Sequence, residues 1–146
     1  MNFIVATDGS EASERAIEYA IEIVDNMDAS LSAVYAVEPD VYETQNAVDE
    51  TNAEERFVIE DIGEAEQRGQ EALDEAEAFA RTRGFDIDTQ LLYGKPIEAI
   101  PGYAEENDVD GIFVGHRGLS EEHEAVLGSV AKGLVDRASV PVTIVR

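Results

Sequence analysis

Apolar residues along this chain repeat on two different periods, and the two kinds of segment alternate. Residues 2–7 form a short, nearly continuous apolar run, which is typical of a strand buried on both faces of a sheet. The next segment repeats its apolar residues at intervals of three and four, as an amphipathic helix does: Ala12, Ala16, Ile17, Ala20, Ile21 and Val24. This alternation predicts a mostly parallel sheet that is covered by helices on both faces.

The same pattern predicts the remaining elements. Strands are predicted over residues 2–7, 30–37, 86–92, 111–114 and 141–145. Helices are predicted after Ser10, over 61–83, after Pro96 and over 127–138. Ser10 is suited to cap a helix, whereas Pro101 inside the third helix predicts a kink or a late start. Residues 38–60 are acidic and weakly periodic, and we expect them to form a loop excursion from a single domain over residues 1–146.

Composition narrows the functional classes. Asp and Glu number 33 against 10 Lys and Arg, a formal net charge of −23. Repulsion between so many acids destabilises a compact chain in dilute salt, but at molar salt the Debye length falls to about 3 Å and most of the repulsion is screened. This composition therefore predicts adaptation to a salt-rich cytoplasm. The alternative is an acidic surface that binds a basic partner. Either interpretation disfavours duplex nucleic acid as a ligand.

Two further absences in the sequence exclude other classes. The chain has no cysteine, which excludes disulfides and thiolate metal sites. No apolar run approaches about 20 residues, and residues 3–6 lack the features of a signal peptide. We therefore expect a cytoplasmic protein that spans no membrane.

Glycines after the fourth predicted strand are the candidate ligand-binding residues. Ligands of open α/β sheets bind beyond the carboxyl ends of the strands, where Asp8 and Gly115 lie. Gly118 follows, and Gly128 and Ser129 come at a helix start, where backbone amides and the helix dipole favour phosphate. Spacing alone also permits a simple tight turn and a helix cap. The pattern is neither a dinucleotide fingerprint nor a Walker P-loop.

The spacing Gly115-x-x-Gly118, nine residues, then Gly128-Ser129 resembles the ATP-binding branch of the universal stress proteins (UspA-like). The resemblance covers essentially the whole chain. It includes residues 6–10 (Ala-Thr-Asp-Gly-Ser), Gly94-x-Pro96, residues 127–131 and Val140-Pro141-Val142.

The resemblance implies a Rossmann-like α/β domain with a five-stranded parallel sheet in the order 3-2-1-4-5 and ATP over the first and fourth strands. Asp8 and the backbone of Val37 would meet the ribose or adenine, and Thr7 and Val114 would line the base pocket. The ribose and phosphates would be held by Gly115, Arg117, Gly118, Gly128, Ser129 and Val130. The family also implies a homodimer through the last strand, Val142, Thr143, Ile144 and Val145, which would cover an exposed sheet edge.

One segment departs from the family pattern. Residues 119–127 carry three glutamates where many relatives have Arg or Lys. We expect weaker binding of a triphosphate in dilute buffer, relieved by salt screening or by Mg²⁺ bridging a glutamate and a phosphate. Arg117 is expected to contact phosphate or to form a surface ion pair. His116 is expected to pack or to face solvent, and Lys95 to be a solvated lysine at a helix start.

The sequence therefore predicts an ATP-binding stress protein that acts as a sensor or regulator. No nucleophile–base pair is recognisable, so catalysis would be limited to slow ATP hydrolysis or autophosphorylation, with Ser129 as a candidate acceptor. The alternative is a dimeric scaffold of the same fold that binds no nucleotide and works through protein partners. An adenylating enzyme is disfavoured because no Ser/Gly-rich pyrophosphate loop follows Asp8.

Overall fold

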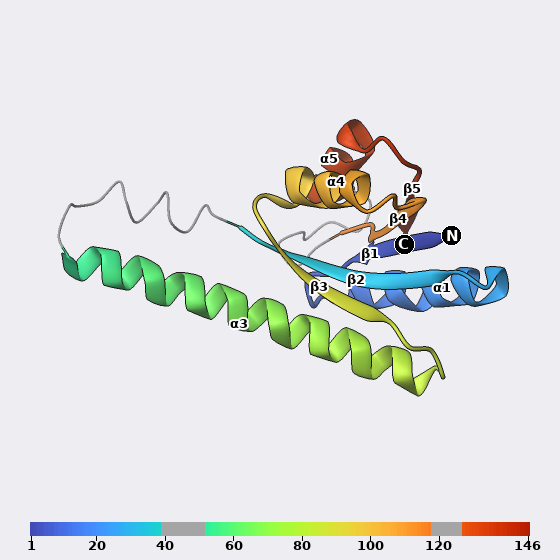
Figure 1. Cartoon of the computed structure of the whole chain (residues 1–146), viewed down its shortest axis with the longest axis horizontal. Helices are drawn as coiled ribbons and strands as arrows, with labels where there is room; N and C mark the ends of the chain where they lie inside the picture. Colours follow the sequence, from blue (N-terminus) through green and yellow to red (C-terminus); the bar gives the residue numbers. More distant parts are fainter. Residues whose placement is uncertain (39–51, 118–126) are drawn as a thin grey trace.

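A parallel sheet forms the centre of the computed structural model, which describes residues 1–38, 52–117 and 127–146, without the side chains of 52–62. Its strands among the described residues are β1 (Asn2–Ala6), β2 (Ser30–Val37), β3 (Asp88–Tyr93), β4 (Gly111–Gly115) and β5 (Val142–Val145). They are ordered β3-β2-β1-β4-β5, and every neighbouring pair is parallel (Figure 1). The predicted fold class and strand order are confirmed.

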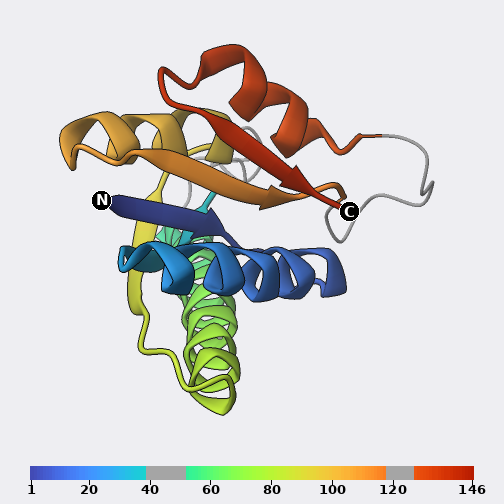
Figure 2. The same cartoon turned by 90° about the vertical axis from the view of Figure 1, so that its right-hand side faces the viewer.

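Helices cover both faces of the sheet. One face carries α1 (Glu11–Met27) and α3 (Asn52–Thr82), and the other carries α4 (Pro96–Glu106) and α5 (Ser129–Arg137) (Figure 2). Successive residues of a strand point to opposite faces, so Val5 of β1 packs in the core under α1 and α3 while Ile4 packs in the core under α4 and α5. Two separate apolar cores therefore hold the layers together.

Local sequence explains where α1 and α4 begin. Ser10 caps α1, and its hydroxyl accepts a hydrogen bond from the Ser13 amide at 3.2 Å. Pro96 occupies the first turn of α4, where a missing amide costs little. The helix then continues through Pro101, so the predicted late start is wrong. Pro101 is buried with Ile100 and Ala104, and this packing offsets the hydrogen bond that the proline ring removes.

The long helix α3 corrects another boundary. It begins at Asn52, so residues 52–60 are helical, although the sequence predicts them to belong to an acidic loop. Alanine, glutamate and arginine in this stretch favour a helix intrinsically, but their apolar periodicity is too weak to mark one. The rest of the predicted loop, residues 39–51, lies outside the described residues.

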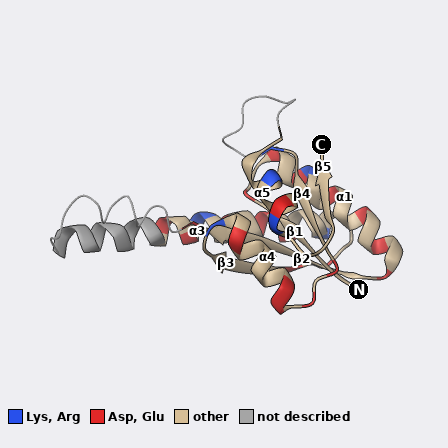
Figure 3. Ribbon diagram, turned by 90° about the horizontal axis from the view of Figure 1, so that it is seen from above, with Lys and Arg blue, Asp and Glu red and all other residues tan. Residues whose placement is uncertain are grey.

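Negative charge is spread over the surface of α1, α3 and α4, with few lysines and arginines between the acids (Figure 3). Ion pairs in the described part of the chain include Arg83–Glu18 at 3.2 Å and Arg137–Glu98 at 3.4 Å, and all four side chains are largely exposed. Exposed pairs stabilise a fold by at most about 1 kcal/mol each, so the two apolar cores supply most of the stability. Among the described residues, no helix is both long enough and apolar enough to cross a bilayer.

A glycine sets the distance between α5 and α4. A Cβ built on Gly133 would lie 2.9 Å from the Ile97 Cβ and closer still to its Cγ2, whereas a Cβ on Gly102 of α4 would meet nothing within 4 Å. Gly133→Ala should lower the free energy of unfolding by about 1–3 kcal/mol through overpacking. Gly102→Ala should leave it unchanged or raise it by up to about 1 kcal/mol, because alanine favours a helix.

Denaturant unfolding of both variants at one fixed molar KCl concentration measures the difference. Equal effects of the two substitutions would contradict the close contact between α4 and α5.

Candidate functional site

A cavity of about 410 Å³ opens at the carboxyl ends of β1, β2 and β4. It lies where β1 is followed along the chain by α1 on one face and the neighbouring β4 leads toward α5 on the other. This is the position at which the strand order reverses, where ligands of open α/β sheets bind. Its size is within the usual range of small-molecule sites.

The cavity brings together the residues that the sequence singled out, apart from Gly118, which lies outside the described residues. Those that line it are Thr7, Asp8, Val37, Val114, Gly115, Arg117, Gly128, Ser129 and Val130. They come from four separate segments of the chain and meet only because the sheet order places β1 between β2 and β4. The glutamates at positions 121, 122 and 124 also lie outside the described residues.

The start of α5 presents amides to the cavity. Gly128 is the N-cap residue, and its carbonyl accepts the first helical hydrogen bond from the Lys132 amide at 3.0 Å. The amides of Val130 and Ala131 have no acceptor among the described residues, as expected in the first turn of a helix. Both residues line the cavity, so the helix directs unused donors and the positive end of its dipole toward it.

The amide of Gly128 has a different role from the one that the family resemblance implies. It donates to the His116 carbonyl at 2.7 Å, so it is not an open donor for a phosphate. The His116 amide in turn donates to the Val145 carbonyl at 2.8 Å. The backbone of His116 therefore fixes the start of α5 to the end of β4 and the end of β5. The His116 side chain is 9% exposed, so it packs and does not face solvent.

Hydroxyl groups fix the turn between β1 and α1. The Ser13 hydroxyl donates to the Ser10 carbonyl at 2.9 Å, so its oxygen accepts from Thr7 Oγ1 at 3.0 Å. Thr7 Oγ1 also accepts from the Gly9 amide at 3.3 Å. These bonds commit the Thr7 hydroxyl to the turn, and the residue serves the cavity as part of its wall.

Asp8 is held by the same turn. Its Oδ1 accepts a hydrogen bond from the Ser10 amide at 2.9 Å, and the side chain is half-buried at the edge of the cavity. A carboxylate has further lone pairs, which suit it to accept from hydroxyl groups of a ligand.

Gly115 is required by the packing of the protein itself. A Cβ on this residue would lie 2.8 Å from both the carbonyl carbon and the carbonyl oxygen of Ala12. The end of β4 therefore passes directly against the first turn of α1. The sequence explains this glycine by approach to a phosphate, but the structure shows that approach to α1 already demands it.

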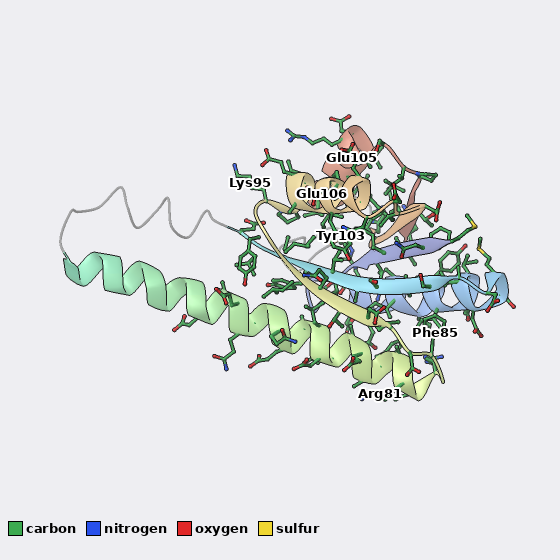
Figure 4. All side chains as sticks on the ribbon, viewed as in Figure 1. Arg81, Phe85, Lys95, Tyr103, Glu105 and Glu106 are labelled. Atoms are coloured by element: carbon green, nitrogen blue, oxygen red, sulfur yellow. The ribbon has the colours of Figure 1, made fainter. Side chains whose placement is uncertain are left out.

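The second strand contributes the opposite wall. Tyr35, Val37 and Glu38 line the cavity, and the Val37 carbonyl accepts from the Gly94 amide at 2.8 Å. Pro96 lines it as well. Lys95 is exposed at the turn between β3 and α4 and is not a lining residue (Figure 4).

Residues of α3 complete the cavity, and sequence reasoning missed them. Ala65 and Arg68 line it, although the helical pattern did not connect α3 with the glycine motif. The signal was Gly69, a glycine in the middle of a helix. A Cβ there would lie 2.7 Å from the Tyr35 ring and 2.8 Å from Leu91, so α3 lies close against β2 and β3.

The charges of the cavity differ from those of the whole molecule. Two carboxylates, Asp8 and Glu38, and two guanidinium groups, Arg68 and Arg117, belong to its described lining. The described lining is therefore neutral, although the chain carries −23.

Comparisons with known proteins agree with this architecture. The universal stress protein family matches residues 1–146. The universal stress protein YxiE of Bacillus subtilis is 32% identical over 143 residues, which cover 98% of this chain and 97% of that protein. The structure of the universal stress protein UspA from Lactobacillus plantarum aligns with a TM-score of 0.83 and 26% identity, covering 100% of this chain and 97% of that one.

A third relative carries a ligand. The crystal structure of a universal stress protein in complex with cAMP aligns with a TM-score of 0.67 and 27% identity. The alignment covers 100% of this chain and 96% of that one.

The contact between β4 and α1 is open to test by substitution. Gly115→Ala should lower the free energy of unfolding by about 1–3 kcal/mol, because the backbone of Ala12 cannot move away as a side chain would. Gly111→Ala, in the same strand, should change it by less than about 1 kcal/mol, because its Cβ would lie 3.0 Å from the half-buried ring of Phe3, a side chain and not fixed backbone.

Urea unfolding without any nucleotide measures both variants. A loss for Gly115→Ala no larger than that for Gly111→Ala would show that the approach of α1 is not what requires this glycine.

Proposed function

The chain belongs to the universal stress protein family, and on that basis we propose that it binds ATP in the cavity beside β1 and acts as a stress-response sensor or regulator. The observation that carries the proposal is the single cavity that joins the Asp8 carboxylate to the open amides at the start of α5. A carboxylate that accepts from ribose hydroxyls and a helix start that donates to phosphates are the two groups that a nucleotide requires.

The dimensions suit such a ligand. Neighbouring strands lie about 4.8 Å apart, so β2 and β4, on either side of β1, are about 10 Å apart. A nucleotide with its phosphates at the start of α5 would place its ribose near Asp8 and its base near Val37. The neutral lining supports the proposal as well, because an acidic site would repel a polyphosphate. The cAMP complex of the relative supports an adenine nucleotide as the ligand class.

Mg²⁺ belongs to the proposal as a partner of the triphosphate. In the described part of the chain no three Asp, Glu or His residues are grouped to hold a metal ion. The glutamates at positions 121, 122 and 124 lie in the sequence between the glycines, and a cation would bridge such carboxylates to phosphate oxygens.

We also propose that the protein forms a homodimer through β5. This strand is at the edge of the sheet, and the carbonyls of Val145 and of Pro141, the residue before the strand, point toward β4. Alternation along the strand then directs the amides of Val142 and Ile144 to the free edge. Exposed apolar side chains lie on the helices that contact or flank this edge, Tyr19 of α1 and Val135 of α5. An unpaired edge beside apolar surface favours association with a second copy.

Nucleotide binding predicts a gain of stability. In molar KCl with Mg²⁺, ATP at about 100 times its Kd should raise the free energy of unfolding by about 2.7 kcal/mol. Thermal unfolding with and without ATP and Mg²⁺ measures the shift. No shift at millimolar ATP would reject the proposal and favour the alternative, a scaffold that works through protein partners.

The phosphate site predicts a matched pair of proline variants. Ser129→Pro removes an amide and a hydroxyl at the first residue of α5, yet the extended Gly128 before it suits a proline. It should weaken ATP binding about tenfold or more, because the proposal makes the Ser129 amide and hydroxyl donors to the phosphates, beside the open amides of Val130 and Ala131. Glu11→Pro makes the same backbone change at the first residue of α1. Glu11 does not line the cavity, so this variant should bind ATP with unchanged affinity.

Titration calorimetry in molar KCl compares the two variants. Equal affinities of the Ser129→Pro and Glu11→Pro proteins would place the phosphates elsewhere.

The dimer predicts a second pair. Ile144→Pro removes an amide from the free edge of β5 and should convert the dimer to a monomer, because proline cannot donate across the edge. Thr89→Pro does the same at the free edge of β3 and should leave the dimer intact. Sedimentation gives the masses, and circular dichroism checks that each variant is folded. A wild-type protein that is monomeric at micromolar concentration would exclude this interface.

A further inference from the structure

The wall of the cavity that α3 provides contains a cation. Ala65 and Arg68 are three residues apart, so they lie on the same face of the helix, and both line the cavity. Ala65 is buried and Arg68 is exposed, which places the guanidinium group toward the mouth. The close approach of Gly69 to Tyr35 fixes this part of α3 over β2.

Arg68 has no carboxylate partner among the described residues, although the chain contains 33 acids. Three other arginines of the described surface, Arg81, Arg83 and Arg137, each lie within 3.4 Å of a glutamate. An arginine that lines a cavity and forms no ion pair there keeps its flat guanidinium group available to a ligand.

Arg68 and the open amides of α5 come from helices on opposite faces of the sheet. Arg68 belongs to the helix over β2 and β3, whereas α5 starts beside β4 on the other face of the sheet. Two strand spacings, about 10 Å, separate β2 from β4. If phosphates occupy the start of α5, Arg68 faces the nucleoside and not the phosphates.

We infer that Arg68 binds the base of the ligand, with its guanidinium group stacked over the ring at the mouth of the cavity. The inference rests on the proposed nucleotide site and names a contact within it. Guanidinium groups stack on aromatic rings, and the planar Arg side chain does so better than the compact ammonium of Lys. Stacking of this kind retains the base by its face, so it acts on any nucleotide that carries a purine.

The test compares ligands with and without each part of the nucleotide. Titration calorimetry in molar KCl gives the Kd of adenosine, AMP and ribose 5-phosphate for the wild type, Arg68→Ala, Arg68→Lys and Arg15→Ala. Arg15 is an exposed arginine of α1 that lines neither described cavity, so its replacement controls for the loss of one positive charge. Unfolding without ligand checks that each variant is folded.

A base contact predicts one pattern. Arg68→Ala should raise the Kd of adenosine and of AMP by the same factor, about fivefold to thirtyfold, and leave the Kd of ribose 5-phosphate unchanged. Arg68→Lys should recover only part of this loss, and Arg15→Ala should change nothing.

Other patterns overturn the inference. Weaker binding of AMP and ribose 5-phosphate, with unchanged binding of adenosine, would show that Arg68 contacts the phosphate and not the base. Equal losses of affinity in Arg68→Ala and Arg15→Ala would show that Arg68 acts only through its positive charge. Full recovery of affinity in Arg68→Lys would show that the contact is not stacking. Unchanged affinities in Arg68→Ala would remove the contact while leaving the proposed function standing. A wild type that binds none of these ligands or ATP would reject both.

Discussion

The close passage of β4 against α1 is the constraint on which the rest of the site depends. At Gly115 the strand lies so near the backbone of Ala12 that no side chain fits between them. Directly after this point the backbone of His116 donates to β5 and accepts from Gly128, which fixes the start of α5. A shift at Gly115 would therefore move α1, β5 and α5 together. Asp8 lies in the turn that precedes α1, so the same contact sets the distance between the carboxylate and the helix amides.

The charge of the chain gives the cavity its second property. A molecule with a formal charge of −23 repels anions over its surface at low salt, and exposed ion pairs offset little of that repulsion. The described lining of the cavity balances two carboxylates with two guanidinium groups. An anionic ligand then experiences local donors at short range and the net charge at long range. Salt screens long-range repulsion more than it weakens buried contacts. Added salt should therefore raise the affinity of the proposed site for a nucleotide, the opposite of its usual effect on phosphate binding.

Sequence reasoning succeeded where the determinants are local and failed where they arise between distant segments. The apolar run of residues 30–37 is the observed β2, and Ser10 is the observed cap, because strand burial and helix capping are written in adjacent residues. The α3 start at Asn52 was missed because helix propensity there acts without apolar periodicity. Pro101 remains helical because it is buried beside Ile100 and Ala104, which belong to the core under α4 and α5. Arg68 was missed because its place at the cavity depends on how α3 crosses β2, which no local spacing encodes.

In the proposed nucleotide site, the hydrogen bonds of the glycine segment also give the two ends of the cavity different roles in binding. The Gly128 amide is committed to His116, which leaves Val130 and Ala131 as the open amides that the described structure directs toward a phosphate. A short row of amides orients a phosphate, but it cannot by itself distinguish a nucleotide from any other phosphate ester. Discrimination must then come from the nucleoside end, where Asp8, Val37 and Arg68 line the cavity. In the proposed site the glycine segment would thus anchor an anion, and residues outside that segment would decide which anion is retained.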